Sequence, residues 1–133
     1  MSNPGINTLA SVVYQFFAGL DNRDNKAVAA LMARDGVWVR QGSELQGQAA
    51  VQKALETRDP QRYTAHIVTN LWVENVTPTT ARVRFYMTAY EMRSGLEKPE
   101  FLGTRDCVDD LRLEEGGWRI LRKESRRIMP PEA

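Results

Sequence analysis

The chain has 133 residues, 42% of them hydrophobic and 26% charged, which is enough to build one soluble globular domain with its own core. Eighteen basic and seventeen acidic residues leave a net charge of +1, so the composition gives no electrostatic footprint for nucleic acid or an anionic membrane. A single cysteine, Cys107, excludes an internal disulfide and a cysteine-based metal cluster.

Two further absences in the sequence bear on where the protein is expected to reside. The N-terminal segment MSNPGINTLA lacks a basic region followed by an apolar run, so we expect no secretion signal. No apolar stretch approaches the roughly 20 residues needed to span a bilayer. We therefore expect a cytoplasmic protein that consists of a single domain over residues 1–133.

The first half of the chain is expected to be mostly helical. From Ile6 to Leu20 apolar residues recur at helical spacing, with Asn7 or Thr8 as a cap. A second short helix should follow, with Asp24 as its N-cap. Its predicted buried stripe consists of Ala27, Val28, Leu31 and Met32.

A strand and a third helix complete this half. The segment DGVWVRQGSELQG predicts a strand from Val37 to Arg40 and then a turn region. Residues 48–57 predict a helix that the Arg58-Asp59-Pro60 sequence ends.

The second half changes to four segments rich in β-branched and aromatic residues, separated by turn signals. They cover residues 62–76, 80–93, 100–114 and 117–128. Without helices between them, these strands should pair antiparallel as a meander. The expected fold class is α+β: a cone-shaped, curved antiparallel sheet wrapped around the N-terminal helices and enclosing a pocket.

Several short motifs in order carry a family resemblance. The motifs extend from about Leu9 to Ile128 in this order: a helix, LDNRD, a helix, a DGVWV strand, a G-x-x-A-V helix, TAHIVTN and a final GGWRI strand. This arrangement resembles the SnoaL-like branch of the nuclear transport factor 2-like superfamily. The resemblance implies a conical barrel with a deep apolar pocket, and a homodimer packed through the outer face of the sheet.

The resemblance also implies a catalytic pair. In members such as scytalone dehydratase and lindane dehydrochlorinase, a histidine in the TAHIVTN-like strand pairs with an aspartate at the end of the first helix. The matching residues are His66, which is the only histidine, and Asp21. Burial favours a neutral imidazole and a carboxylate fixes its tautomer, so the pair would be a general base that needs no metal or cofactor.

Each member of this pair also has a purely structural interpretation. A histidine in an apolar strand is often a core residue with one satisfied hydrogen bond. Aspartate is common where a helix ends and a turn begins.

The accessory residues of known members are incomplete. Leu20 stands where scytalone dehydratase-like sites have a tyrosine, and no second histidine exists. Arg40 lies near the position where ketosteroid isomerase-like members have the aspartate that acts as their general base, so that mechanism is not expected. Phe16 replaces the lysine of dehydrochlorinase-like sites, whereas Arg122 or Lys123 could supply their basic residue on the last strand.

The predicted pocket lining combines residues from several segments. Strict alternation would place Asn70 and Trp72 on the same strand face as His66. The segment TRDCVDD carries three carboxylates, of which two should pair with arginines across the sheet and one, Asp110, could enter the cavity. Cys107 should be a small buried residue rather than a nucleophile. The full predicted lining is Phe16, Leu20, Trp38, Val68, Asn70, Trp72 and Asp110.

Two classes of function fit these observations. The first is a cofactor-free enzyme that uses His66 and Asp21 for an elimination, isomerisation or cyclisation of a small apolar or cyclic molecule. The second is a non-catalytic module for ligand binding or dimerisation, such as a protein like the small subunit of a ring-hydroxylating dioxygenase. Fold alone does not distinguish them.

Overall fold

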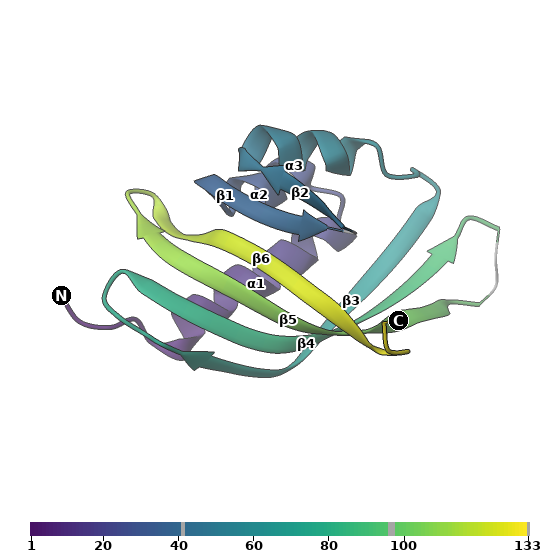
Figure 1. Ribbon diagram of the computed structural model, residues 1–133. Helices are drawn as coiled ribbons and strands as arrows, with labels where there is room; N and C mark the ends of the chain where they lie inside the picture. Colours follow the sequence, from purple (N-terminus) through teal and green to yellow (C-terminus); the bar gives the residue numbers. More distant parts are fainter. Residues whose placement is uncertain (41, 96–97, 133) are drawn as a thin grey trace.

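The computed structural model describes residues 1–40, 42–95 and 98–132. Over these residues the chain forms three helices and six strands (Figure 1). The helices are α1 (Ile6–Asp21), α2 (Asn25–Ala30) and α3 (Gly47–Glu56). The strands are β1 (Met32–Arg40), β2 (Ser43–Gln46), β3 (Arg62–Glu74), β4 (Thr80–Arg93), β5 (Glu100–Glu114) and β6 (Gly117–Met129).

One curved sheet holds all six strands in the order β2-β1-β6-β5-β4-β3. The predicted meander is confirmed, because β3, β4, β5 and β6 pair antiparallel in succession. The first strand joins the last one in parallel, and β2 folds back on β1 as a hairpin. As a result, β3 and β2 are the two edges of the sheet.

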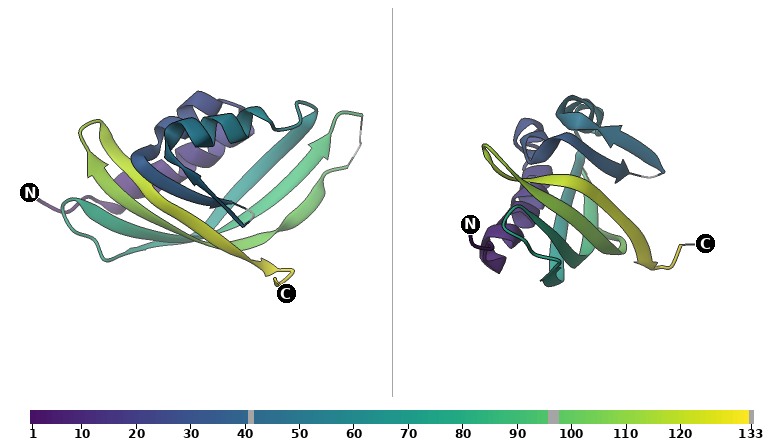
Figure 2. Two further views of the ribbon diagram at one scale, coloured as in Figure 1. Left: turned by 45° about the horizontal axis from the view of Figure 1, so that its top comes forward. Right: turned by 60° about the vertical axis from the view of Figure 1, so that its left-hand side comes forward.

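Helix α1 fills the concave side of this sheet, as Figure 1 and the two further views in Figure 2 show. Its apolar stripe is buried because the spacing places these side chains on one helical face. The buried members of the stripe are Leu9, Ala10, Val12, Val13, Phe16, Phe17 and Leu20. They meet a second buried set from the sheet: Ala81, Val83, Phe85, Cys107, Leu111 and Ile120. The α+β class and the curved sheet are thus confirmed.

The second helix is shorter than its apolar spacing predicted. It ends at Ala30, and Met32 already belongs to β1 rather than to the helix. The strand begins early because Met32 pairs with Ile120 of β6, and Leu31 accepts a hydrogen bond from the Ile120 N–H at 2.8 Å. A partner almost ninety residues away thus overrides the local helical period.

Two local predictions at the element boundaries were wrong. Neither Asn7 nor Thr8 caps α1, because Gly5 occupies the N-cap position and makes no side-chain cap hydrogen bond. Part of the expected turn after Arg40 is strand β2, whose register pairs Trp38 with Leu45. By contrast, the Asp24 cap is confirmed, since its carboxylate accepts the Ala27 N–H at 3.2 Å.

Among the described residues, no helix combines the length and the apolar character needed to cross a membrane.

Candidate functional site

The C-terminus of α1 brings an acidic side chain against β3. Asp21 is the last residue of α1, and the chain turns away at Arg23, which has a left-handed φ of 58°. On β3 the side chains alternate, so that Arg62, Thr64 and His66 point inward while their neighbours are exposed. The buried stripe of α1 packs on the sheet, and this packing sets Asp21 beside the inward face of β3.

The Asp21 carboxylate accepts three hydrogen bonds, all from β3. Its Oδ1 lies 2.6 Å from His66 Nδ1 and receives the Thr64 hydroxyl at 2.9 Å. Its Oδ2 accepts the backbone N–H of His66 at 2.9 Å. The carboxylate therefore fixes both the backbone and the ring of His66.

This arrangement determines the tautomer of the imidazole. A carboxylate accepts hydrogen bonds, so the proton on the neutral ring belongs to Nδ1, which donates to Asp21. The second ring nitrogen, Nε2, then carries the free lone pair. His66 is thus oriented as a proton acceptor through Nε2.

The electrostatic environment keeps His66 neutral at neutral pH. Burial of the ring lowers its pKa below the ordinary 6.5, and this effect exceeds the opposing hydrogen bond and charge of Asp21. The positive charges of Arg58 and Arg62 lower the pKa of His66 further. A neutral imidazole with a free lone pair is the protonation state that a general base requires.

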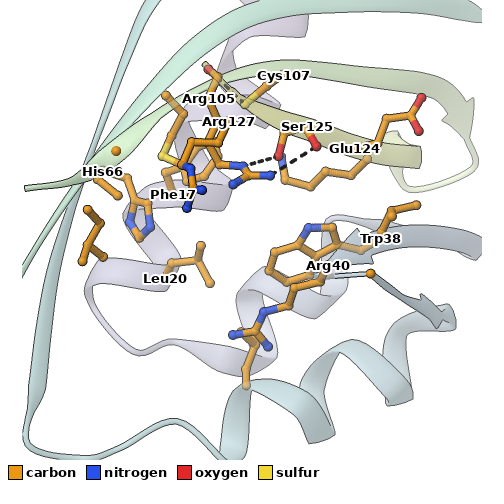
Figure 3. A pocket seen from close by; sticks show the side chains of 18 of the residues that line it. Phe17, Leu20, Trp38, Arg40, His66, Arg105, Cys107, Glu124, Ser125 and Arg127 are labelled. Atoms are coloured by element: carbon orange, nitrogen blue, oxygen red, sulfur yellow. Dashed lines mark hydrogen bonds between the residues drawn. The ribbon is translucent and has the colours of Figure 1, made fainter. Parts of the chain in front are cut away.

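A pocket of about 550 Å³ lies between the sheet and the helices, and the His66 ring is part of its wall. Figure 3 shows Trp38 and Arg40 on one side of this pocket, Arg105 and Ser125 on the other, and His66 at one end. Its apolar lining residues are Phe17, Leu20, Trp38, Val39, Leu55, Met87, Ala89, Leu102 and Cys107. Its charged lining residues are Arg40, Arg58, Arg62, Arg105, Lys123, Glu124, Arg127 and Glu132.

A second, smaller recess of about 340 Å³ lies on the other side of His66. Asp21 and Val68 line this recess, whereas the lining of the main pocket includes neither of them. A molecule in the main pocket therefore meets the imidazole, and the carboxylate stands behind it.

A buried ion pair also reaches the pocket wall. Lys123 Nζ lies 3.0 and 3.1 Å from the two carboxylate oxygens of Asp109, and both side chains are buried. The ammonium also lies 4.3, 4.7 and 5.3 Å from the ring centroids of Phe16, Phe17 and Phe85. Burial raises the pKa of Asp109, and the Lys123 charge opposes this rise.

Three residues of the predicted lining lie elsewhere. Asn70 adopts a left-handed φ of 54°, and the β3–β4 register shifts between Thr69 and Trp72. Such a bulge reverses the alternation of side chains, so Asn70 and Trp72 face solvent instead of sharing the His66 face. Asp110 also points away from the pocket and pairs with Arg82 at 2.8 Å.

The remaining predicted lining residues divide between core and pocket. Leu20 and Trp38 line the main pocket, whereas Phe16 is fully buried in the core and stacks edge-on against Trp38.

The acidic segment of β5 faces both sides of the sheet. Asp106 pairs across the sheet with Arg126 at 3.4 Å, as expected for one of the predicted arginine partners. The carboxylate that turns inward is Asp109 rather than Asp110. The buried position of Cys107 could have indicated this, because residues 107, 109 and 111 share one strand face.

Cys107 itself is buried, and burial raises the pKa of its thiol to about 12. It is therefore a poor nucleophile at neutral pH.

In the sequence Arg58 is distinguished only as part of a helix-ending segment, yet the structure makes it a functional candidate. Its guanidinium donates to the Leu20 carbonyl at 3.1 Å and to the Thr64 hydroxyl at 3.4 Å. It therefore ties the end of α1 to β3 next to the His66–Asp21 pair.

Within the described parts of the chain, no group of three or more His, Cys, Asp and Glu side chains is placed to share a metal ion.

A curved sheet closed by helices around such a pocket is characteristic of the nuclear transport factor 2-like, cystatin-like class of folds. The sequence from residue 6 to residue 124 matches the model of the SnoaL-like domain. The chain therefore belongs to the SnoaL-like domain family. A comparison with curated proteins gave no match.

Several solved structures have the same fold. A candidate scytalone dehydratase from Novosphingobium aromaticivorans is 23% identical, with a TM-score of 0.80 over 93% of this chain and 84% of that chain. A candidate aromatic ring hydroxylase from the same organism is 19% identical, with a TM-score of 0.80 over 92% and 88% of the two chains.

A protein from Catenulispora acidiphila in complex with S-DNPA is 17% identical, with a TM-score of 0.78 over 92% of each chain. At these identities the similarity establishes the fold alone.

Proposed function

We propose that this protein is an enzyme that removes a proton from a small, largely apolar and cyclic molecule, with His66 as the general base. The observation that carries the proposal is a neutral imidazole held by Asp21 through Nδ1, with its ring in the wall of a 550 Å³ pocket. The resulting class of reaction is an elimination, isomerisation or cyclisation. The scytalone dehydratase-like neighbour and the SnoaL-like family agree with this class.

In the proposed step, Nε2 of His66 takes a proton from a carbon atom of the substrate. The electron pair of that C–H bond then forms a double bond, and a leaving group departs with its own bonding pair, as chloride or, with the proton that His66 returns, as water. In an isomerisation the proton returns instead at another carbon. Asp21 accepts the Nδ1 hydrogen bond throughout and balances the imidazolium that forms. Neither event requires a group from outside the chain.

Lys123 is the residue on the last strand that fits the basic position implied by the resemblance. It lines the pocket and is 5% exposed, whereas Arg122 is more exposed and lies 3.5 Å from Glu124. Lys123 and His66 both contact the ring of Phe17. We therefore propose that the Lys123 ammonium stabilises negative charge that develops on the substrate when His66 removes the proton.

The activity is tested with a panel of cyclic carbonyl compounds that carry a β-hydroxyl or β-chloro group. Proton NMR in D₂O reports both deuterium uptake at carbon and the appearance of a double bond. We expect turnover by the wild type and a loss of about 100- to 10,000-fold in His66→Ala. Retention of the wild-type rate in His66→Ala would exclude His66 as the base.

The coupling of the two residues is tested separately by nitrogen-detected NMR of His66. In Asp21→Asn the carboxylate charge that opposes the effect of burial is lost, so we expect the pKa of His66 to fall further. The wild type should show the tautomer with the proton on Nδ1. An unchanged titration in Asp21→Asn would contradict the assigned role of Asp21.

A non-catalytic module is the second candidate function. The absence of a second histidine and the presence of Leu20 in place of tyrosine favour it, and the aromatic ring hydroxylase-like neighbour has the same fold. The NMR panel distinguishes the two candidates, because a binding module would bind compounds without exchanging their carbon-bound protons.

A further inference from the structure

Three arginine side chains from different elements meet at the wall of the main pocket. Arg40 ends β1, Arg58 follows α3, and Arg62 begins β3. Their charges are close enough to affect one another: Arg62 lowers the pKa of Arg40, and both Arg62 and Arg40 lower the pKa of Arg58. The fold thus gathers like charges in a partly buried place, which is unfavourable unless something compensates them.

Only one of the three has a carboxylate partner within the parts of the chain that the structure describes. Arg62 Nε lies 2.7 Å from Glu91. The hydrogen bonds of Arg58 go to neutral oxygens. The carboxylate whose charge raises the pKa of Arg58 is Asp21, which already accepts three hydrogen bonds from β3. Arg40 stacks on the ring of Trp38 at 5.2 Å.

Burial adds to the cost of these two charges. It is the largest cause that lowers the pKa of both Arg40 and Arg58. Two other cations of the pocket have carboxylate partners: Lys123 pairs with Asp109, and Arg105 pairs with Glu132 at 3.0 Å. The Arg127 side chain donates to the Pro130 carbonyl at 2.9 Å and lies with Arg105 on the side of the pocket opposite Arg40 (Figure 3). Arg40 and Arg58 therefore combine a cost of burial with the lack of a carboxylate partner in the described structure.

The cluster lies beside the proposed base. Arg58 donates to Thr64, whose hydroxyl donates to the same Asp21 oxygen that His66 Nδ1 contacts. The positive charges of Arg58 and Arg62 also act on the His66 ring, where they add to the lowering of its pKa by burial. An anionic group bound at this cluster would therefore lie near the carbon atom from which His66 removes a proton.

We propose that Arg40 and Arg58 bind a carboxylate of the substrate, so that the enzyme acts on aromatic or cyclic organic acids. This inference rests on the proposed function and adds the substrate class. Planar guanidinium groups match the two oxygens of a carboxylate, and the apolar ring of the acid would lie against Leu20, Trp38 and Met87.

The donors at this cluster differ from those of a typical phosphate site. Helix α3 presents its C-terminal end next to Arg58, with Thr57 as the C-cap. That end offers carbonyl oxygens instead of the N–H groups that commonly surround a phosphate. The donors at this place are therefore side chains of arginine.

Binding of the acid would also strengthen the base. Arg58 and Arg62 lower the pKa of His66 in the free protein, so a carboxylate that neutralises part of this charge should raise that pKa. The rise provides a readout of binding that does not depend on turnover. It also distinguishes binding at this cluster from binding at a distant surface.

The experiment compares 2-naphthoate with its neutral counterpart 2-naphthalenemethanol, by calorimetry and by the NMR titration of His66. We expect the wild type to bind the acid at least about tenfold more tightly than the alcohol, with a raised His66 pKa for the acid only. Arg40→Gln and Arg58→Gln should each lose this preference. Arg126→Gln is the matched control, because Arg126 is 71% exposed and outside the pocket lining.

Each other outcome overturns the proposal. Equal affinity for the acid and the alcohol, no binding of the acid at millimolar concentration, or an unchanged preference in Arg40→Gln would exclude a carboxylate site. Tighter binding of 2-naphthyl phosphate than of the acid would assign the cluster to phosphate esters instead. If Arg58→Gln fails to fold because α1 and β3 lose their link, Arg40→Gln still decides.

His66→Ala separates this inference from the proposed function. It should abolish proton exchange while it retains the preference for the acid. If the wild type prefers the acid over the alcohol but turns over no substrate, the carboxylate site is supported and the enzyme is rejected. If the wild type turns over neutral substrates only, the enzyme is supported and the carboxylate site is rejected.

Discussion

The pKa of His66 links the site to stability. In the unfolded chain the imidazole titrates near 6.5, and in the fold burial lowers its pKa below that value. The unfolded state therefore binds more protons between these two values. The contribution of His66 to stability is complete above about pH 6.5 and is lost as the pH falls through the folded pKa.

We accordingly expect the free energy of unfolding to be lower at pH 5 than at pH 7, because the unfolded state takes up more protons at His66 over this range. His66→Asn is the control, because asparagine keeps a donor for Asp21 but does not titrate. Denaturant unfolding at both pH values measures the difference between the two proteins. An identical pH dependence in His66→Asn would show that His66 does not contribute.

The pair of Lys123 and Asp109 is a second residue-scale feature with a large expected effect. Asp109 is fully buried, and Lys123 is its ion-pair partner in the described structure. Removing one charge leaves the other buried and uncompensated, which is more costly than losing an exposed ion pair.

Lys123→Met should therefore lower the free energy of unfolding by about 3–5 kcal/mol. The double variant Lys123→Met with Asp109→Leu should recover most of this loss, because neither charge remains. Arg122→Met is the neighbouring control at a 42% exposed side chain. Equal losses in the single and the double variant would mean that packing, and not charge, dominates.

At the scale of elements, the contact between β1 and β6 depends on a close backbone approach. A Cβ atom on Gly36 would lie 2.5 Å from the Ile120 carbonyl oxygen and 3.0 Å from that of Ala33. These are backbone atoms, so the added methyl group cannot be accommodated by moving a side chain. The register between the two strands also shifts in this region.

Gly36→Ala is expected to destabilise the protein by about 1–3 kcal/mol, since strained packing must be relieved by moving the backbone. Because Trp38 and Arg40 follow on β1, a shift of that strand should also alter the pocket. Thermal unfolding measures the loss, with Gly5→Ala as the control because nothing lies within 4 Å of its added Cβ. A wild-type stability in Gly36→Ala would contradict the close approach.

Among the elements, the sequence predicted the four long strands β3 to β6 well but did not predict where β1 begins. The four long strands carry dense β-branched and aromatic residues between clear turn signals, and their pairings are local hairpins. The beginning of β1 depends instead on a parallel partner at the other end of the chain. Local periodicity contains no information about such a partner, so Met32 was expected in a helix.

For the whole molecule, the outer face of the sheet presents apolar and aromatic side chains to solvent. Tyr63 is 57% exposed, Ile67 48% and Tyr90 39%, and all three lie on β3 and β4. Such a face is costly to leave in water. It agrees with the homodimer that the family resemblance implies, which we retain as a prediction.

Light scattering after size exclusion tests this expectation. We expect a mass of two chains for the wild type and of one chain for Ile67→Glu, because a charge would be buried at the centre of the interface. Ile6→Glu introduces the same change at a 48% exposed residue outside the sheet and should remain dimeric. A monomeric wild type would exclude this interface.

Local patterns in the chain were enough to predict the α+β class, the meander and the placement of His66 on a strand after a helix that ends in Asp21. These features follow from hydrophobic period, turn residues and a family pattern, all of which are local or ordered along the chain. The sequence also indicated that one acidic residue of β5 turns inward, although it favoured Asp110 over Asp109.

The set of side chains that share the pocket depends on long-range packing, which the sequence pattern does not reveal. A left-handed Asn70 reverses the alternation of β3, and so removes Asn70 and Trp72 from the face of His66. Arg40 and Arg58 line the same pocket because α3 packs on β1, and not because of proximity in sequence. The physical reason is that a bulge or a distant strand partner changes which way side chains point without changing the local sequence pattern.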